Sequence, residues 1–322
     1  MLRTPFCDLV GIETPIVQAS FGPWSSVEIT AAVSNAGALG SYGTAMRPFE
    51  VIRQDVERLH GLTDRPFAVN HALRPLNEEA FALTLEAEPR VISLALGLSA
   101  DLVRRAHDRG IVVLQQVHTA EQARRAAELG ADAIIAQGSE AGGFGGTVST
   151  LTLLPQVVDA VAPIPVLAAG GIADGRGLAA ALLLGAQGAN IGTRFLASEE
   201  ADVSEDWKAR ILAAQSEEAV KVEFAEAVFP PPTEGGFDTA PRVLRTEFVD
   251  EWNRRPQEAA EHADELRADL MAALLEGRAH ELVPFTGQTV GLIHEIRPAA
   301  EIVRRIVEEA DEVLRGAGRL FR

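Results

Sequence analysis

Cysteine is almost absent from this chain of 322 residues, which contains only Cys7. A single cysteine excludes an internal disulfide and a metal site built from a cysteine cluster, and it fits the reducing cytoplasm. Long apolar runs are missing too, because no stretch of about 18 apolar residues occurs, at the start of the chain or later. We therefore expect a soluble, cytoplasmic protein that is not exported and has no membrane partner.

Positive charge is also scarce. The chain has 29 Lys and Arg residues against 46 Asp and Glu residues, which gives a formal net charge of −17. Such a field repels the phosphate backbone of nucleic acids, so no nucleic-acid partner is expected. The sequence also lacks a histidine pair at helical spacing, a calcium loop and the Gly-x-Ser-x-Gly elbow of serine hydrolases. We predict no metal site.

The chain does contain eight short apolar runs that alternate with segments of helical period. With 47% hydrophobic residues it can bury a full globular core. The alternation predicts parallel βα units and an α/β fold, a (β/α)8 TIM barrel. A doubly wound sheet is the rival, but its glycine-rich turn would follow the first strand, whereas here such turns follow the last three. The predicted strands are residues 15–19, 38–41, 66–70, 91–94, 111–114, 133–136, 165–168 and 188–191.

The pattern changes after Phe195. Residues 197–295 are charged and mainly helical, apart from an extended stretch at 230–232 and a glycine-containing joint at 234–236. Residues 298–315 have the period of a helix that returns to the barrel wall. We predict a barrel domain of residues 1–196 and 296–322, with a helical subdomain of residues 197–295 inserted after the eighth strand.

Glycine-rich turns follow the sixth, seventh and eighth predicted strands. They are Gln137-Gly138-Ser139-Glu140-Ala141-Gly142-Gly143, Ala168-Ala169-Gly170-Gly171-Ile172 and Asn190-Ile191-Gly192-Thr193-Arg194-Phe195. Glycine allows the backbone to approach a ligand and to offer bare N–H groups, so turns on consecutive strand ends can hold one phosphate between them. We interpret them as a cradle for the phosphate of a flavin.

These turns, together with Pro15-Ile16-Val17-Gln18, the segment 31–40 and Thr286-Gly287-Gln288, resemble the nitronate monooxygenase family, also called 2-nitropropane dioxygenase-like. The resemblance covers most of the chain in the same order. It implies a TIM barrel that binds FMN and a helical second domain that closes over the flavin and covers the substrate. Flavin-dependent enoyl-acyl carrier reductases and NADH:quinone reductases are among the relatives, so the family alone does not fix the reaction.

The resemblance also implies a set of cofactor-binding residues. Asn70 ends the third strand, and its amide can both donate to and accept from the flavin edge. Gln116 follows the fifth strand near the flavin pyrimidine, although its neighbour Gln115 could serve instead. Backbone amides and a hydroxyl of the cradle should bind the FMN phosphate. The predicted FMN-binding residues are Asn70, Gln116, Gln137, Gly142, Gly143, Gly170, Gly171, Asn190, Ile191, Gly192 and Thr193.

Phe144 is the informative departure from the family pattern, since nitronate-oxidising relatives have a histidine after the paired glycines. Phenylalanine can neither take a proton nor donate a hydrogen bond. Three explanations stay open: hydride transfer with apolar stacking alone, another group in place of the histidine, or weak activity. His71, beside Asn70, is the replacement candidate, although alternation along the strand would turn it away from Asn70. A loop or structural histidine is the alternative there, and also for His118.

The sequence therefore predicts an FMN-dependent oxidoreductase acting on a small molecule. Oxidation of a small nitronate or related carbon acid with O2 ranks first. An NAD(P)H-dependent reductase of a quinone or enoyl substrate is the alternative, with NAD(P)H binding transiently over the flavin instead of in a Rossmann domain. A non-catalytic barrel that binds another phosphate ligand is the second alternative. A homodimer is an additional prediction.

Overall fold

Eight parallel strands form a barrel in the computed structural model, which describes residues 2–229, 232 and 236–318. Neighbouring strands follow the order β1-β8-β7-β6-β5-β4-β3-β2. A parallel bridge between Val17 and Leu39 joins β1 to the start of β2 and completes the circle. The predicted (β/α)8 barrel is thus confirmed. The strands are β1 (Ile16–Gln18), β2 (Gly40–Gly43), β3 (Phe67–Ala72), β4 (Val91–Ala95), β5 (Val112–Val117), β6 (Ala133–Gln137), β7 (Val166–Ala169) and β8 (Gly188–Ile191).

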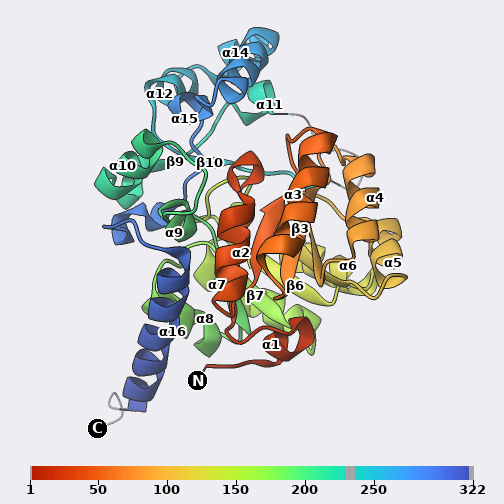
Figure 1. The fold of residues 1–322 in the computed structure, drawn as a ribbon. Coiled ribbons are helices and arrows are strands. Elements are labelled where there is room, and N and C mark those ends of the chain that lie inside the picture. The colour runs from red at the N-terminus through yellow and green to blue at the C-terminus, as the bar shows by residue number, and fades with distance from the viewer. Residues whose placement is uncertain (1, 230–231, 233–235, 319–322) are drawn as a thin grey trace.

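Helices surround the barrel, as Figure 1 shows. Serine, threonine, asparagine or aspartate side chains cap the starts of several of them; Thr119, for example, accepts a hydrogen bond from the backbone N–H of Gln122. The last helix, α16, packs along α8 and α2. The surrounding helices are α2 (Val27–Asn35), α3 (Phe49–Leu62), α4 (Glu78–Ala87), α5 (Ala100–His107), α6 (Ala120–Glu128), α7 (Thr150–Val161), α8 (Gly175–Leu183) and α16 (Ala299–Gly316).

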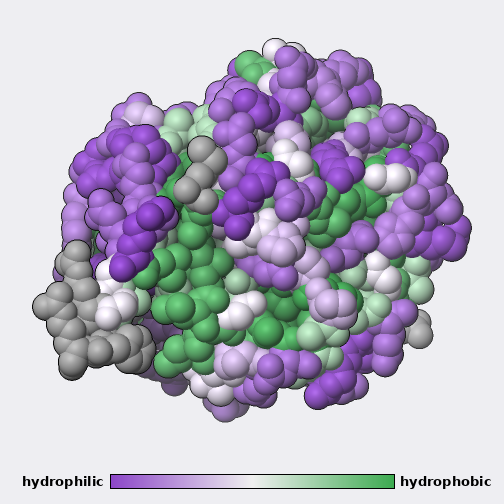
Figure 2. All heavy atoms as spheres, turned by 90° about the horizontal axis from the view of Figure 1, so that it is seen from below, coloured by the Kyte–Doolittle hydropathy of each residue, from purple (hydrophilic) through white to green (hydrophobic). Residues whose placement is uncertain are grey.

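One end of the barrel is closed by α1 (Pro5–Val10). Phe6, Cys7 and Val10 are fully buried, and they pack with residues near the amino-terminal ends of the strands, including Val91 and Val112. Figure 2 shows this end of the molecule, where apolar residues lie within a largely hydrophilic rim. Because this end is filled by side chains, the carboxyl ends of the strands are left for a site.

Residues 197–295 form a mainly helical segment after β8 and α9 (Thr193–Leu196), drawn above the barrel in Figure 1. It includes an antiparallel pair of strands, β9 (Ala219–Lys221) and β10 (Arg242–Leu244), that the sequence did not predict. The predicted extended and joint stretches at 230–236 lie largely outside the described residues. The other elements of the segment are α10 (Glu205–Ala213), α11 (Ala225–Val228), α12 (Glu247–Asn253), α13 (Pro256–Glu261), α14 (Ala263–Leu275), α15 (Ala279–Leu282) and the 3-10 turns η2 (Ser216–Glu218) and η3 (Gln288–Leu292).

The strand pair β9/β10 is attached to the loop that follows β6. Gly143 and Arg242 exchange two backbone hydrogen bonds of 3.1 and 2.9 Å, and the N–H of Ala240 donates to the carbonyl of Gly145 at 2.7 Å. The inserted segment therefore holds the loop that carries Phe144. Within the described part of the chain, no helix combines the length and apolar character needed to cross a membrane.

Candidate active site

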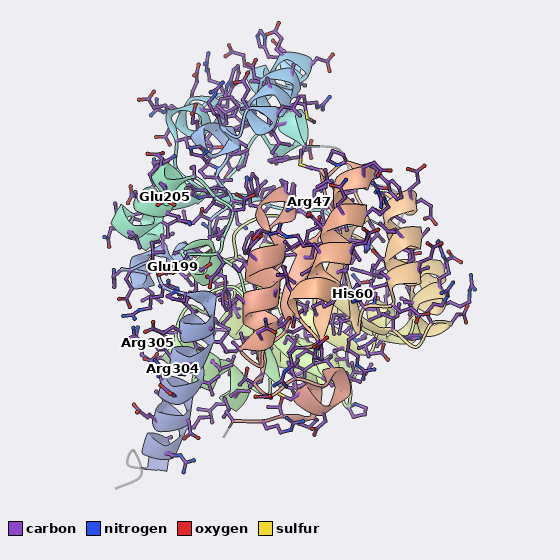
Figure 3. All side chains as sticks on the ribbon, viewed as in Figure 1. Arg47, His60, Glu199, Glu205, Arg304 and Arg305 are labelled. Carbon is purple, nitrogen blue, oxygen red and sulfur yellow. The ribbon has the colours of Figure 1, made fainter. Side chains whose placement is uncertain are left out.

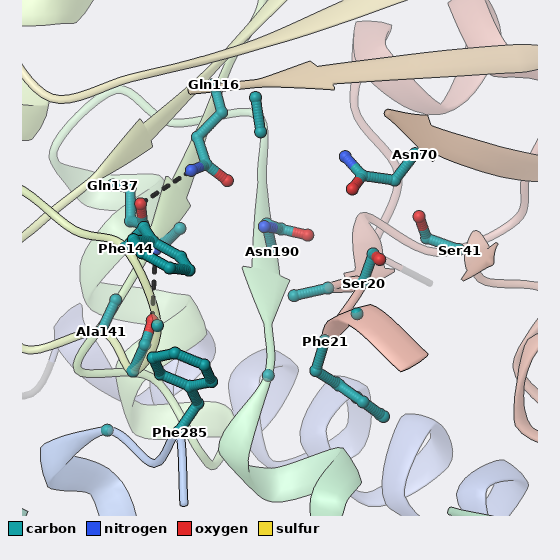
Figure 4. A pocket seen from close by; sticks show the side chains of 18 of the residues that line it. Ser20, Phe21, Ser41, Asn70, Gln116, Gln137, Ala141, Phe144, Asn190 and Phe285 are labelled. Carbon is teal, nitrogen blue, oxygen red and sulfur yellow. Dashed lines mark hydrogen bonds between the residues drawn. The ribbon is translucent and has the colours of Figure 1, made fainter. Parts of the chain in front are cut away.

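A cavity opens at the carboxyl ends of the strands and is lined by residues from every part of the barrel (Figure 4). It collects side chains and turns that are more than 170 residues apart in the sequence, such as Val17 and Thr193. Every residue predicted to bind FMN lines this cavity, and so does Phe144; His71 does not. The cavity lining includes Asn70, Gln116, Gln137, Gly142, Gly143, Phe144, Gly170, Gly171, Asn190, Ile191, Gly192 and Thr193.

The turns after β7 and β8 form one end of the cavity, which we call the anion end: Gly171, Gly192 and Thr193. The backbone N–H groups of Gly171 and Gly192 have no hydrogen-bond acceptor among the described residues. The hydroxyl of Thr193 accepts from the N–H of Gly287 at 2.9 Å, which leaves its own proton free to donate. Free donors facing a cavity fit a phosphate.

Gly171 is the position in this end that most requires glycine. Its φ is +75°, a conformation that strains other residues, and a Cβ there would meet only the side chain of Glu140, at 3.9 Å. A side chain would therefore project into the cavity. The Glu140 carboxylate itself accepts hydrogen bonds from the N–H and hydroxyl of Thr150, at 2.9 and 3.0 Å. Both of these donors to the Glu140 carboxylate therefore belong to Thr150.

Amide side chains line the middle of the cavity (Figure 4). Asn70 donates to the hydroxyl and the carbonyl of Ser93, at 3.0 and 3.2 Å, so its own oxygen is left for a ligand. Gln116 Nε2 donates to Gln137 Oε1 at 2.8 Å. Gln115, the alternative to Gln116, is 1% exposed and donates to the carbonyls of Leu94 and Gly97, so it is turned away from the cavity.

Aromatic side chains form another part of the lining, which we call the aromatic wall: Phe144, Phe285 and Trp24. The Phe144 and Phe285 ring centroids are 5.2 Å apart, and those of Phe285 and Trp24 are 6.3 Å apart. Behind them, Phe229 lies 4.9 Å from Phe144. The Arg74 guanidinium carbon is 5.9 Å from the centroid of Phe144. Sequence reasoning found Phe144 but missed Phe285 and Trp24, because nothing in the local pattern links these distant residues.

The histidines stay outside this cavity. His71 is 1% exposed and lies between the hydroxyls of Thr44 and Thr84, at 3.1 and 3.0 Å. Burial lowers its pKa to about 3, so the ring is neutral at pH 7. This environment favours a structural histidine over a replacement for the family histidine. Figure 3 places His60 on α3, away from the strand ends.

Charge is nearly absent from the cavity lining. No Lys, Arg or His lines the cavity among residues 2–229, 232 and 236–318, and the one ionisable residue that does is Glu140. In the same part of the chain, no cluster of three or more His, Cys, Asp or Glu residues could hold a metal. The lining therefore offers hydrogen bonds from the anion end and apolar contact from the aromatic wall, and the nearest cation named above, Arg74, lies against Phe144 outside the lining.

A model of the nitronate monooxygenase family matches residues 3–81 and 77–309. The chain belongs to this family. Like its other members, it is an enzyme of the oxidoreductase class. The family's proteins are flavoproteins, which agrees with the donors at the anion end.

Relatives of the chain have several activities. It is 39% identical over 252 residues, 77% of this chain and 68% of the relative, to a (3aS,4S,5R,7aS)-5-hydroxy-7a-methyl-1-oxo-octahydro-1H-indene-4-carboxyl-CoA dehydrogenase of Mycobacterium tuberculosis. Its structure is similar to that of FabK from Thermotoga maritima, with a TM-score of 0.89, 35% identity and 98% of each chain covered. A nitroalkane oxidase from Streptomyces ansochromogenes gives a TM-score of 0.83 at 28% identity, covering 97% of this chain and 99% of the other.

Proposed function

We propose that this chain is an FMN-dependent oxidoreductase that binds the neutral, apolar acyl part of a carbonyl compound, such as an acyl thioester, and oxidises or reduces it at the carbon–carbon bond beside the carbonyl. One observation carries the proposal: the aromatic wall has Phe144 where nitronate-oxidising relatives have histidine, and none of the described Lys, Arg or His residues lines the cavity. An apolar group gains from burial against the phenylalanine rings, whereas an anion would lose its hydration without a partner.

The residues have separate roles in this proposal. Gly171, Gly192 and Thr193 hold the phosphate of FMN through N–H and hydroxyl donors. The amides of Asn70 and Gln137 bind the polar edge of the flavin ring. When bound, FMN supplies the two-electron redox chemistry, which no side chain of this cavity can supply. Phe144 and Phe285 hold the apolar acyl group, and water gives or takes the proton at the carbon beside the carbonyl.

The name of the M. tuberculosis relative supports an acyl thioester, since that protein is a dehydrogenase of a carboxyl-CoA compound. In the segment 197–295, Phe285 reaches the cavity and completes the aromatic wall. We therefore propose that this segment covers the substrate. A large apolar acyl group would use this wall better than a small nitroalkane, because the favourable free energy grows with the apolar area buried.

Oxidation of a nitronate with O2 is the second candidate. The similarity to a nitroalkane oxidase structure favours it. A nitronate is already deprotonated, so its oxidation does not require a base to remove the carbon-bound proton. Against it stands the cavity lining, whose one ionisable residue, Glu140, carries negative charge.

Absorbance and anaerobic reduction test the proposal. The purified protein, supplied with FMN, should show the absorbance of a bound flavin. Stopped-flow mixing under argon with a saturated acyl-CoA, NADH, NADPH and a nitronate should then show bleaching by the acyl-CoA or by a nicotinamide, followed by reoxidation with an enoyl-CoA. Bleaching by the nitronate alone would favour the second candidate. A protein that binds no FMN would contradict both.

A further inference from the structure

A buried histidine contacts one of the polar side chains of the cavity from behind. His118 follows β5 and is 2% exposed. Its Nε2 lies 3.0 Å from Oε1 of Gln137, the same oxygen that accepts from Gln116 Nε2 at 2.8 Å. Gln116 and Gln137 line the cavity and His118 does not. His118 therefore contacts the cavity lining from behind, at the Gln137 side chain and at the backbone of Phe144, and the roles given above leave it without a function.

The protonation of this ring follows from its surroundings. Burial lowers the pKa of His118 to about 4, so the imidazole is neutral at pH 7. With Gln137 Oε1 facing the ring, Nε2 carries the proton of the neutral imidazole and donates it to this oxygen, and the buried Nδ1 has no hydrogen-bond partner among the described residues. His118 is thus a fixed donor to Gln137.

The ring is also held in place. A Cβ on Gly146 would lie 2.7 Å from the Cβ of His118, so the loop after β6 packs directly on this residue. The ring of Phe237 contacts the imidazole edge-on, with centroids 5.7 Å apart. The backbone N–H of His118 donates to Gln122 Oε1 at 2.7 Å. The imidazole has little freedom to leave Gln137.

Two donors on Oε1 determine which way the Gln137 amide faces. Gln137 Oε1 faces both Gln116 Nε2 and His118 Nε2, so the NH2 group of Gln137 is directed away from these two side chains. In the observed orientation, Gln137 Nε2 has only a long contact, 3.4 Å, to the carbonyl of Gly142. One N–H of this group is left for a ligand in the cavity.

We propose that His118 is a positioning residue that fixes Gln137 as a hydrogen-bond donor to the flavin ring and so raises the flavin's reduction potential. The inference rests on the proposed function, because it needs a flavin in the cavity. Reduction adds electron density to the ring, so a fixed donor stabilises the reduced form more than the oxidised one. The histidine missing at position 144 is not restored by His118, which cannot reach the substrate; His118 acts on the cofactor.

The test compares His118→Leu with His118→Gln in the FMN-loaded protein. Leucine removes the donor and glutamine can restore one. At a fixed potential set by a reference dye, the ratio of reduced to oxidised flavin should fall about ten-fold in His118→Leu, equivalent to about 30 mV for a two-electron couple. The ratio in His118→Gln should return to within about two-fold of the unsubstituted protein, as expected for recovery of one hydrogen bond.

His71→Leu is the matched control, because His71 is equally buried and neutral but bonds to Thr44 and Thr84. It should lower stability and leave the flavin ratio unchanged. Gln137→Met removes the proposed donor to the flavin and leaves His118 unchanged. If His118→Leu does not fold, the flavin ratio in Gln137→Met tests the proposal. An unchanged ratio in His118→Leu or Gln137→Met, or an equal fall in His71→Leu, would overturn the proposal. Failure of the unsubstituted protein to bind FMN would be seen first and would remove the proposed function itself.

Discussion

The anion end and the aromatic wall of the cavity are built in different ways. The anion end consists mainly of backbone groups in the turns after two neighbouring strands, because β7 and β8 pair with Ala169 opposite Asn190, two residues before Gly171 and Gly192. The aromatic wall consists of side chains from three distant parts of the chain, Trp24, Phe144 and Phe285. The anion end depends on glycine and on strand pairing, and the aromatic wall depends on which side chains the loops present.

Because of this difference, the anion end indicates the family and its cofactor, whereas the aromatic wall bears on the reaction. Backbone donors bind any phosphate in the same way, so the anion end indicates the cofactor and says little about the substrate. In the proposed function the aromatic wall contacts the substrate, so a single residue there, such as Phe144 in place of a histidine, would alter the chemistry. Proteins with the same cradle can therefore act on acyl thioesters or on nitronates.

Gly171→Val should have the largest effect on FMN binding, because it places a side chain in the anion end. The new side chain would project into the space proposed for the phosphate. We expect the dissociation constant of FMN to rise about 100-fold, since charge-assisted hydrogen bonds are displaced. Flavin fluorescence titration of the apoprotein measures the change.

Gly110→Val provides the control for backbone strain. Gly110 has a φ of +71°, close to the +75° of Gly171, but no atom within 4 Å of an added Cβ and no place in the cavity lining. Both substitutions should cost about 1–2 kcal/mol of stability through the left-handed conformation. Only Gly171→Val should weaken FMN binding, and an equal loss in both variants would mean that the anion end is not the phosphate site.

Phe144→His should have an intermediate effect and act on the aromatic wall alone. A histidine here could donate a hydrogen bond to an anionic oxygen of the nitronate, and one such donor contributes about 100-fold or more in some enzymes. We expect nitronate oxidation, measured as oxygen consumption, to rise at least about ten-fold, while reaction with an acyl-CoA declines. FMN affinity should not change. Phe144→Leu, which stays apolar, is the control, and its nitronate turnover should match that of the unsubstituted protein.

The barrel could be predicted from the sequence because its strands are apolar runs separated by helices, a pattern that is local. The strands β9 and β10 could not. Each has three residues, below the length at which a strand pattern is recognised, and they pair across 20 residues of intervening chain. In the structure, these two strands hold the loop that carries Phe144.

The cavity follows the same rule. Glycine turns identified the anion end, since a backbone that must approach a ligand leaves glycine in the sequence. Phe285 could not be assigned, because an isolated phenylalanine in a helical segment is usually a core residue. His71 shows the value of strand alternation: Asn70 lines the cavity and its neighbour points behind the wall.

Lys221 should give the smallest effect, and it concerns the loop behind the aromatic wall. Its ammonium donates to the carbonyls of Gly146 and Ala240, at 3.1 and 2.5 Å. Burial lowers its pKa from 10.5 to about 8, and the charge of Arg242 lowers it further, against the opposing charges of Glu140 and Glu223. Between pH 8 and 10.5 the unfolded chain therefore binds more protons at this site than the folded protein.

The sign of the pH effect follows from that difference. The free energy of unfolding should rise with pH across this window by less than about 1 kcal/mol per unit, since a fully coupled proton gives about 1.4 and solvent screens this half-buried group. Denaturant unfolding at pH 7.5, 8.5 and 9.5 should show that the rise is lost in Lys221→Met. Lys208→Met, at the chain's other lysine, should keep it. The anion end is made mainly of backbone N–H groups, which Lys221 does not contact. FMN affinity should therefore be the same in Lys221→Met as in the unsubstituted protein. A loss of affinity would show that the anion end depends on the loop that carries Phe144.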